Sequence, residues 1–416
     1  MNITVVCDVL GKENNGTTTA AMNLIRSMKA KGHHVRVVCP DPERKGEKDF
    51  FVVPQYNLLF LKKYLQKNGV SLAKPVKKTL EEAIEGADVV HMLIPFMLSR
   101  SALKICRAKG IPVTAGFHCQ AENFTSHIFL KDSRLAAKLV YHNFYNRFYR
   151  YVDAVHYPTR FICDIFENET APTNHYVISN GVHKRFKPLE NKNCEKKPDE
   201  PFTIVFTGRY SKEKSHKVLI DGVAQSKYSD RIRLVFAGSG PLEDKLKKYA
   251  AQKLVNQPEF RFFSRDKLIE ELHNADLYVH PAEIEIEAIA CLEAICSGLV
   301  PVIADSPRSA TRYFALDEKN LFRFNDPADL AAKIDWWLEH PEERRKRSDE
   351  YSEMRGQFDF DNCMDQMERM LYETAAKKRR TGSRGNGYAA DEFAEAGLSE
   401  GYFPGEELTA EVAANG

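Results

Sequence analysis

The 416-residue sequence lacks several features that would assign it to a class directly. No stretch reaches the roughly eighteen consecutive apolar residues of a membrane-spanning helix. The opening segment, MNITVVCDVLGKENNG, has no basic residues before its apolar run and no small-residue cleavage site, so it does not match a signal peptide. The formal net charge is only +2, which argues against the strong positive charge of a nucleic-acid-binding protein.

Signs of a metal site are also missing. Nine cysteines are scattered along the chain, and no two of them form a C-x-x-C pair. Most lie in apolar runs, which is typical of reduced core cysteines in a cytosolic protein. The D-x-D sequence Asp359-Phe360-Asp361 precedes a helical pattern instead of following an apolar strand, so we interpret it as a helix N-cap. We therefore expect no metal.

The chain does contain a regular alternation of short apolar runs and helical patterns. Strands are expected at ITVVCDV, HHVRVVCP, ADVVHML, IPVTAGF and DAVHYP, and again at FTIVFTG, RIRLVFAG, EFRFFS, DLYVHP and LVPVIA. In the second half, helices are expected at about 214–227, 241–253 and 287–297. This alternation predicts βαβ units, parallel sheets and outer helices. We expect an α/β protein with two Rossmann-like domains that face each other across a cleft.

Changes in composition suggest the domain limits. A polar, charged and proline-containing stretch at 186–201 is interpreted as a linker between a domain at 1–185 and a second domain at 202–358. A last helical pattern covers 359–376. Residues 377–416 are first basic and glycine-rich, then acidic with few apolar residues, which predicts a disordered tail.

Three turns between a strand and a helix carry residues that suit a phosphate-bearing ligand. Gly16 lies in CDVLGKENNGTTTA, which is neither a Walker A motif nor G-x-G-x-x-G but leads to a helix N-terminus that can bind an anion. Arg209 and Lys214, in FTGRYSKEK, are two cations that suit a diphosphate. Gly238 and Gly240, in VFAGSGP, let the backbone approach a ligand. Each segment can also be an ordinary turn.

Four glutamates, at positions 283, 285, 287 and 293, lie in HPAEIEIEAIACLEAICSG. Acids near a helix N-terminus stabilise it by about 0.3–1 kcal/mol, which accounts for Glu283 and Glu287 if the helix begins near residue 287. Glu293 would lie nearly two turns into a buried helix, where an unpaired carboxylate is costly. Because carboxylates accept hydrogen bonds from vicinal hydroxyls, a ribose or hexose is a fitting partner.

The stretch from Glu285 to Glu293 and the following PVIA resemble the E-x7-E signature of retaining glycosyltransferases of family 4, which have the GT-B fold. NNGTTTAAMNLIRSMKAKGHHVRVV, VISNGVHKRFKP, GRYSKEK and AGSGP resemble further motifs of that family, in the same order. The resemblance covers roughly residues 1–370. Three positions depart from the family pattern: a single glycine in the first loop, Ala288 in place of glycine, and His183 in place of aspartate.

The resemblance implies a role for each of these residues. Glu293 would hold the nucleotide ribose, and Glu285 would hold the hydroxyls of the donor sugar without acting as a nucleophile. His118, in TAGFHCQAENF, would be the active-site histidine near that sugar. Transfer would retain the anomeric configuration and need no metal, and the last helix would cross back onto the first domain. The further donor-binding residues would be Gly16, Arg209, Lys214, Gly238, Gly240, Ile286, Ala288 and Ile289.

Two stretches of the first half predict contact with an anionic membrane surface. Residues 51–80 hold six lysines and no acid, and residues 128–151 combine five basic residues with seven aromatic ones. The alternative is an ordinary amphipathic helix whose aromatic side chains face the core. The candidate contacts are Lys62, Lys63, Lys67, Lys77, Lys78, Arg147 and Arg150.

The second half also resembles bacterial diacylglycerol α-glucosyltransferases of the monoglucosyldiacylglycerol synthase type. We therefore expect a peripheral enzyme at the cytosolic face of the membrane that moves glucose from UDP-glucose to diacylglycerol. The alternatives are a transferase for an exopolysaccharide or another lipid-linked glycan, a nucleotide-sugar epimerase on the same fold, and a non-catalytic nucleotide-sugar binder. The sugar and the base are not fixed by the sequence.

Overall fold

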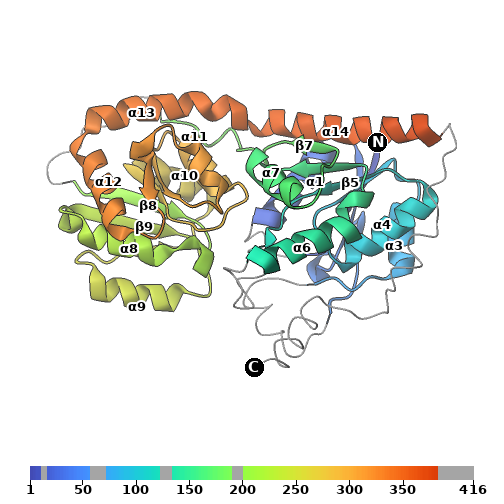
Figure 1. Cartoon of the computed structure of the whole chain (residues 1–416), viewed down its shortest axis with the longest axis horizontal. Coiled ribbons are helices and arrows are strands. Elements are labelled where there is room, and N and C mark those ends of the chain that lie inside the picture. The colour runs from blue at the N-terminus through green and yellow to red at the C-terminus, as the bar shows by residue number, and fades with distance from the viewer. Residues whose placement is uncertain (11–15, 57–71, 122–133, 190–199, 383–416) are drawn as a thin grey trace.

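The computed structural model describes residues 1–10, 16–56, 72–121, 134–189 and 200–382. These residues form two α/β domains that lie side by side (Figure 1). Every strand pair in both sheets is parallel, as the alternation of strands and helices predicts. The strands are short apolar runs because helices cover both faces of each sheet.

The first domain has a seven-stranded sheet in the order β3-β2-β1-β4-β5-β6-β7. The strands are β1 Asn2–Val6, β2 His34–Cys39, β3 Phe50–Val52, β4 Val89–Met92, β5 Val113–Gly116, β6 Ala154–Tyr157 and β7 His175–Val177. One face packs on α3 (Lys77–Ile84), α4 (Met97–Lys109), α6 (Arg134–Arg147) and α7 (Arg160–Glu169). The other face packs on α1 (Gly16–Ala30) and on the last helix, α14 (Phe360–Gly382).

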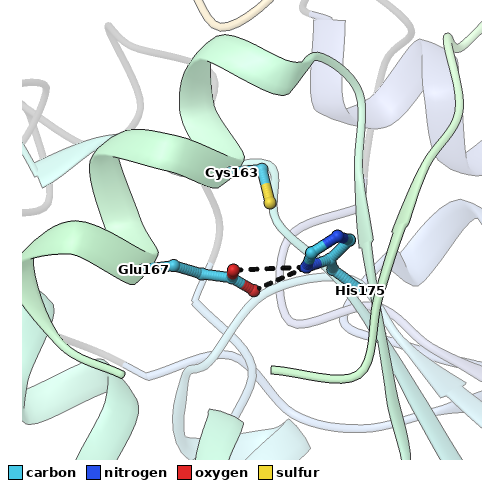
Figure 2. Close-up of side chains that lie close together, drawn as sticks. All are labelled: Cys163, Glu167 and His175. Carbon is cyan, nitrogen blue, oxygen red and sulfur yellow. Dashed lines mark hydrogen bonds and ion pairs between the residues drawn. The ribbon is translucent and has the colours of Figure 1, made fainter. Parts of the chain in front are cut away.

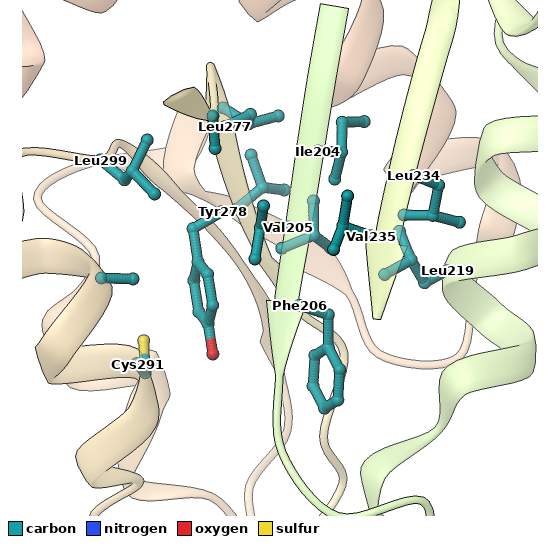
Figure 3. Close-up of a cluster of buried hydrophobic side chains, with 14 of the residues drawn as sticks. Ile204, Val205, Phe206, Leu219, Leu234, Val235, Leu277, Tyr278, Cys291 and Leu299 are labelled. Atoms are coloured by element: carbon teal, nitrogen blue, oxygen red, sulfur yellow. The ribbon is translucent and has the colours of Figure 1, made fainter. Parts of the chain in front are cut away.

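The second domain has a six-stranded sheet in the order β10-β9-β8-β11-β12-β13. Its strands are β8 Phe202–Thr207, β9 Ile232–Ala237, β10 Glu259–Arg261, β11 Leu277–His280, β12 Pro301–Asp305 and β13 Leu321–Arg323. Its helices are α8 His216–Gln225, α9 Glu243–Lys253, α10 Arg265–Asn274, α11 Ile289–Cys296, α12 Pro327–Glu339 and α13 Pro341–Glu353. Figure 3 shows the core, where side chains of β8 and β9 meet Leu219 of α8 and Cys291 of α11.

The chain crosses between the domains twice, and the two crossings lie together. Val182 N donates to Phe358 O over 2.6 Å, and Phe360 N donates to Val182 O over 3.1 Å. Gly181 has a φ of +76°, and a Cβ there would lie 2.8 Å from the Phe360 Cα, so glycine is needed at this close approach. After the second crossing, α14 runs along the first domain (Figure 1).

The start of α14 confirms the N-cap interpretation of the D-x-D sequence. Asp359 Oδ1 accepts a hydrogen bond from Asn362 N over 2.9 Å, and the helix begins at Phe360. The helix continues to Gly382, so residues 377–382 are helical, although the sequence assigned them to the tail. The run AAKKRR consists of good helix formers, which explains the extension. The rest of the predicted tail, 383–416, lies outside the described residues.

The sheets meet at the carboxyl ends of their strands. Gln120 follows β5 and donates through Nε2 to Arg308 O, beyond β12, over 3.2 Å. Thr159 follows β6 and donates through Oγ1 to Ile286 O, beyond β11, over 2.7 Å. These are the strand ends at which α/β proteins bind ligands.

Within the described residues, no helix combines the length and the apolar character needed to cross a membrane. The eight cysteines in this part of the chain are free thiols, and seven of them are buried. Their burial agrees with the prediction that they are reduced core residues.

Candidate active site at the domain boundary

The four glutamates lie on a loop and a helix that follow β11. We call Glu283–Ala288 the glutamate loop, which leads into α11 at Ile289. Ala288 has the left-handed conformation, with φ of 64° and ψ of 68°, and no acid lies in the first turn of α11. The helix-dipole interpretation of Glu283 and Glu287 is therefore wrong. A left-handed alanine costs about 1–2 kcal/mol, and glycine would adopt this conformation without that cost.

Glu285 is buried and contacts two side chains of the second domain, a lysine and a histidine. Lys214 Nζ, from the short 3-10 turn Lys212–Lys214, forms an ion pair with Glu285 Oε1. His280 Nε2 lies 3.1 Å from the same oxygen. Burial alone raises the pKa of Glu285, but the Lys214 charge and the His280 hydrogen bond outweigh it and lower the pKa to about 2. At neutral pH Glu285 is a carboxylate that can only accept hydrogen bonds.

A chain of hydrogen-bonded, buried polar side chains extends from Glu285 into the second domain. His280 Nδ1 lies 3.1 Å from Tyr278 Oη, which lies 3.1 Å from Thr207 Oγ1. Burial lowers the pKa of His280, so its neutral ring donates through Nε2 to Glu285 and accepts at Nδ1 from Tyr278. Sequence reasoning missed Tyr278 and His280. The available signal was two polar-tipped residues at alternate positions of the apolar strand DLYVHP.

Glu293 lies on α11 and differs from Glu285 in having no partner. Its side chain is half-buried, and no described residue donates a hydrogen bond to its carboxylate. Burial raises the pKa of Glu293 to about 7, against the opposing charge of Arg265. An unpaired carboxylate in such a place is destabilising unless a ligand supplies donors, and two hydroxyls of a ribose would do so.

The other two glutamates contact opposite domains. Glu283 Oε1 lies 3.1 Å from the Arg308 guanidinium, within the second domain. Glu287 accepts hydrogen bonds from Ser179 and Asn180, on the first crossing of the chain. Neither residue was assigned a site role from the sequence.

The glycines of the predicted phosphate-binding turns have different surroundings. A Cβ on Gly238 would collide with Gly208 O, and a Cβ on Gly240 would lie 2.6 Å from the Tyr210 backbone. These two glycines therefore let the AGSGP turn pack directly on the turn that carries Arg209. Gly16 begins α1 and is exposed, with open space around it. The structure thus places Gly238, Gly240, Arg209 and Lys214 around the carboxyl ends of β8 and β9.

His118 lies across the boundary, in the segment after β5. A Cβ on Gly116 would be 2.6 Å from His118 Nε2, so glycine makes room for this ring. Burial, and then the neighbouring His156 and His91, keep the pKa of His118 well below its usual range. Two residues further on, Gln120 shares the Arg308 carbonyl oxygen with the Glu285 amide, at 3.2 and 3.4 Å. The His118 segment and the glutamate loop are thus joined at one atom.

The predicted membrane contacts are not all on one side of the first domain. Lys77 and Lys78 are exposed at the start of α3, toward the domain boundary. Arg147 and Arg150 are exposed at the end of α6 and just beyond it. They lie near the start of β6, and thus at the amino ends of the strands, away from the domain boundary. The structure does not bring these two pairs together. Lys62, Lys63 and Lys67 lie outside the described residues.

The aromatic residues of the second stretch that the structure describes face the core. Tyr141, Phe144 and Phe148 are buried in the first domain, so for them the amphipathic-helix alternative is confirmed and the membrane prediction is wrong. The opposite face of α6 instead exposes Leu135 by 68% and Leu139 by 55%, beside the exposed Lys138. This apolar pair, at the end of α6 nearer the domain boundary, was missed from the sequence.

One group of described side chains has atoms close enough to hold a metal ion: Cys163, Glu167 and His175 (Figure 2). His175 Nδ1 already donates to Glu167 over 3.0 Å, and Thr173 donates to the same oxygen through its amide and its hydroxyl. Burial raises the pKa of the Cys163 thiol to about 12, so in the metal-free protein it is protonated. The three side chains are explained as a hydrogen-bonded group.

Two family models match the chain in succession. The model described as Glycosyltransferase Family 4 matches residues 14–186, and the one described as Glycosyl transferases group 1 matches residues 189–354. Their junction falls within the predicted linker.

Named relatives are similar over most of the chain. Alpha-monoglucosyldiacylglycerol synthase of Streptococcus pneumoniae is 24% identical over 321 residues, covering 73% of this chain and 71% of the relative. A GDP-mannose-dependent alpha-mannosyltransferase of Mycobacterium tuberculosis is 24% identical over 312 residues, covering 73% and 79%.

Solved structures share the fold. Anabaena HepE in complex with UDP-glucose superposes with a TM-score of 0.68 at 17% identity, covering 90% of this chain and 100% of the other. The catalytic domain of cholesterol-alpha-glucosyltransferase from Helicobacter pylori is 54% identical but covers 37% of this chain and 97% of that one. Its TM-score is 0.36, which supports no structural conclusion.

Proposed function

Because the chain belongs to family 4 of the glycosyltransferases and has the GT-B fold, we propose that it transfers glucose from UDP-glucose to a lipid acceptor, with diacylglycerol as the leading candidate. The transfer of a sugar from a nucleotide sugar is the activity of the family. The glucosyl donor, the lipid acceptor, the retention of configuration and the location at the inner face of the cell membrane are the proposal.

The donor half of the proposal rests on the contrast between Glu285 and Glu293. Glu285 is ionised, firmly oriented and next to a lysine, which suits a sugar hydroxyl beside a diphosphate. Glu293 is unpaired and half-buried, which suits a ribose diol. Arg209, together with the N-termini of α1 and α11, would complete the phosphate site.

The same geometry favours a mechanism without a protein nucleophile. The low pKa of Glu285 makes it a poor base, so its role is to accept hydrogen bonds that strengthen as positive charge develops on the sugar ring. His118 is neutral and can exchange hydrogen bonds with the sugar without adding a charge. The leaving phosphate then assists the acceptor hydroxyl, and we propose that the chemistry needs no metal.

The acceptor half rests on the exposed face of α6. The start of α6 combines exposed apolar and basic groups in the domain that faces the donor site: Leu135, Leu139 and Lys138. Lys77 and Lys78, at the start of α3, also lie toward the carboxyl ends of the strands. Such a combination suits an anionic membrane surface, which would place a lipid hydroxyl near the domain boundary. The relative from S. pneumoniae, named alpha-monoglucosyldiacylglycerol synthase, supports diacylglycerol as the acceptor to test first.

The direct test is release of UDP from UDP-glucose with and without vesicles of anionic lipid that contain diacylglycerol. We expect release only with the vesicles, at the same rate in EDTA. Release with vesicles that carry cholesterol or a lipid-linked glycan, but not with diacylglycerol, would contradict diacylglycerol as the acceptor. Turnover of GDP-mannose, but not of UDP-glucose, would contradict UDP-glucose as the donor.

A second prediction concerns the exposed leucines. Replacing both Leu135 and Leu139 by aspartate should weaken binding to anionic vesicles about tenfold or more, because two apolar contacts of about 1 kcal/mol each are lost and negative charge is added. UDP binding, measured by calorimetry, should not change. Val255→Asp, at an exposed apolar residue of the second domain, is the matched control. Unchanged vesicle binding in the double variant would exclude this face as the docking surface.

A further inference from the structure

The glutamate loop is held by both domains, at neighbouring residues. Glu283 and Glu285 contact Arg308 and Lys214 of the second domain. The next residue, Ile286, packs against the core of the first domain, and its carbonyl accepts the Thr159 hydroxyl. The loop that carries Glu285 therefore has its position set from two sides.

Glu287 provides the strongest of the contacts with the first domain. Its Oε1 accepts from Ser179 Oγ over 2.5 Å and from Asn180 N over 3.0 Å, and its Oε2 accepts from Asn180 Nδ2. Only 4% of Glu287 is exposed. A carboxylate is costly to bury: burial raises the pKa of Glu287 to about 7, and the three hydrogen bonds from one short segment offset only part of that cost.

The segment to which Glu287 is hydrogen-bonded is the first crossing between the domains. Asn180 is followed by Gly181, which touches Phe360, and by Val182, which exchanges backbone hydrogen bonds with the second crossing. Movements between two domains are absorbed at a few residues of this kind. Glu287 thus links the place where the domains can pivot to the loop that orients Glu285.

We propose that Glu287 is a positioning residue for the donor sugar: by binding the crossing segment, it holds the glutamate loop where Glu285 can reach the sugar. The inference rests on the proposed donor role of Glu285. When only a fraction of the molecules has the loop in place, the apparent affinity for the donor falls by that fraction, whereas the bound complex reacts normally. A nucleotide without a sugar does not use Glu285 and is unaffected.

The test uses the full chain with Glu287→Gln, Asn180→Asp and the double variant. In Glu287→Gln an amide NH2 faces the Asn180 amide NH2, so one hydrogen bond is lost. The double variant exchanges amide and carboxylate and restores it. We expect KM for UDP-glucose to rise about tenfold in Glu287→Gln, with kcat within about twofold and the Kd for UDP unchanged, and to recover in the double variant. Glu342→Gln, on the exposed start of α13, is the control.

The outcomes separate this inference from the proposed function. Wild-type turnover of UDP-glucose with an unchanged KM in Glu287→Gln would overturn the positioning role alone. Binding of UDP-glucose to neither protein would overturn the donor assignment and this inference together. If Glu287→Gln does not fold, Thr159→Val removes the hydroxyl bonded to Ile286 O, and KM should then rise about threefold with kcat unchanged.

Discussion

Glutamine in place of Glu285 is expected to lower kcat about a thousandfold while UDP binds as tightly as before or more tightly. The two effects have one cause. In the free protein the Lys214 ammonium is paired with Glu285, so removal of the negative charge leaves Lys214 wholly available to the diphosphate. The sugar hydroxyls, in contrast, lose an ionised acceptor whose hydrogen bonds strengthen as the glycosidic bond breaks.

Two measurements separate this prediction from general damage to the site. Calorimetry with UDP measures the affinity for the diphosphate, to which Lys214 contributes. Single-turnover transfer from UDP-glucose measures the rate of the chemical step, to which Glu285 contributes. Thr207→Val is a useful companion, because it removes the last member of the chain that supports Glu285 and should cost about tenfold in kcat. A parallel loss of UDP binding and turnover in Glu285→Gln would mean that Glu285 holds the site together and does not act on the sugar.

The fold could be predicted because its information is local. Strands covered on both faces are continuous apolar runs, and the turns between them contain glycine or proline, so DLYVHP and LVPVIA were identifiable as strands without any tertiary information. The start of α11 could not be located in the same way. It is set by the left-handed conformation of Ala288, a residue type that normally gives no such signal.

The roles of the glutamates depend on contacts between residues far apart in the sequence. Glu285 and Glu287 are two residues apart in equally apolar surroundings, yet one contacts the second domain and the other contacts Ser179 and Asn180 of the first. No pattern in the local sequence separates them. Glu285 was picked out through the family resemblance, which does not extend to a role for Glu287.

The first domain shows the opposite case, in which the signal was present but not used. Tyr141 and Phe144 lie at helical spacing on one face of α6, Phe148 follows just beyond its end, and Leu135 and Leu139 fall on the other face. The order of helix and strand along the chain also indicated where the end of α6, with Arg147, would lie. A helix between parallel strands must end near the start of the next strand, so the end of α6 lies far from the strand ends where ligands bind.

The unpaired carboxylate of Glu293 gives the second large effect. Glu293→Gln should weaken UDP binding about a hundredfold, because two hydrogen bonds from the ribose to a charged acceptor are worth about 3 kcal/mol together. The ligand-free variant should nevertheless be more stable than the wild type at pH 8. Such a pair of opposite changes is expected where a protein keeps a destabilising group for its ligand.

The sign of the stability change follows from the raised pKa. The carboxyl has a folded-state pKa of about 7, above its ordinary value of 4.5, so the native state holds a proton that the unfolded chain releases between these values. The stability contributed by this group is therefore complete below pH 4.5 and is lost as the pH rises through 7. Glutamine does not titrate, so the advantage of the variant should be about 3 kcal/mol at pH 8 and absent at pH 4.5.

Saturating UDP should cancel most of this difference in stability. The wild type gains stability in proportion to the logarithm of ligand over Kd, and a hundredfold weaker variant gains about 2.7 kcal/mol less at the same concentration. In thermal unfolding at pH 8, Glu293→Gln should thus be clearly more stable than the wild type without nucleotide and about equally stable with saturating UDP. Stabilisation of both proteins to the same extent by UDP would show that the ribose does not bind at Glu293, and the unpaired carboxylate would then need another partner.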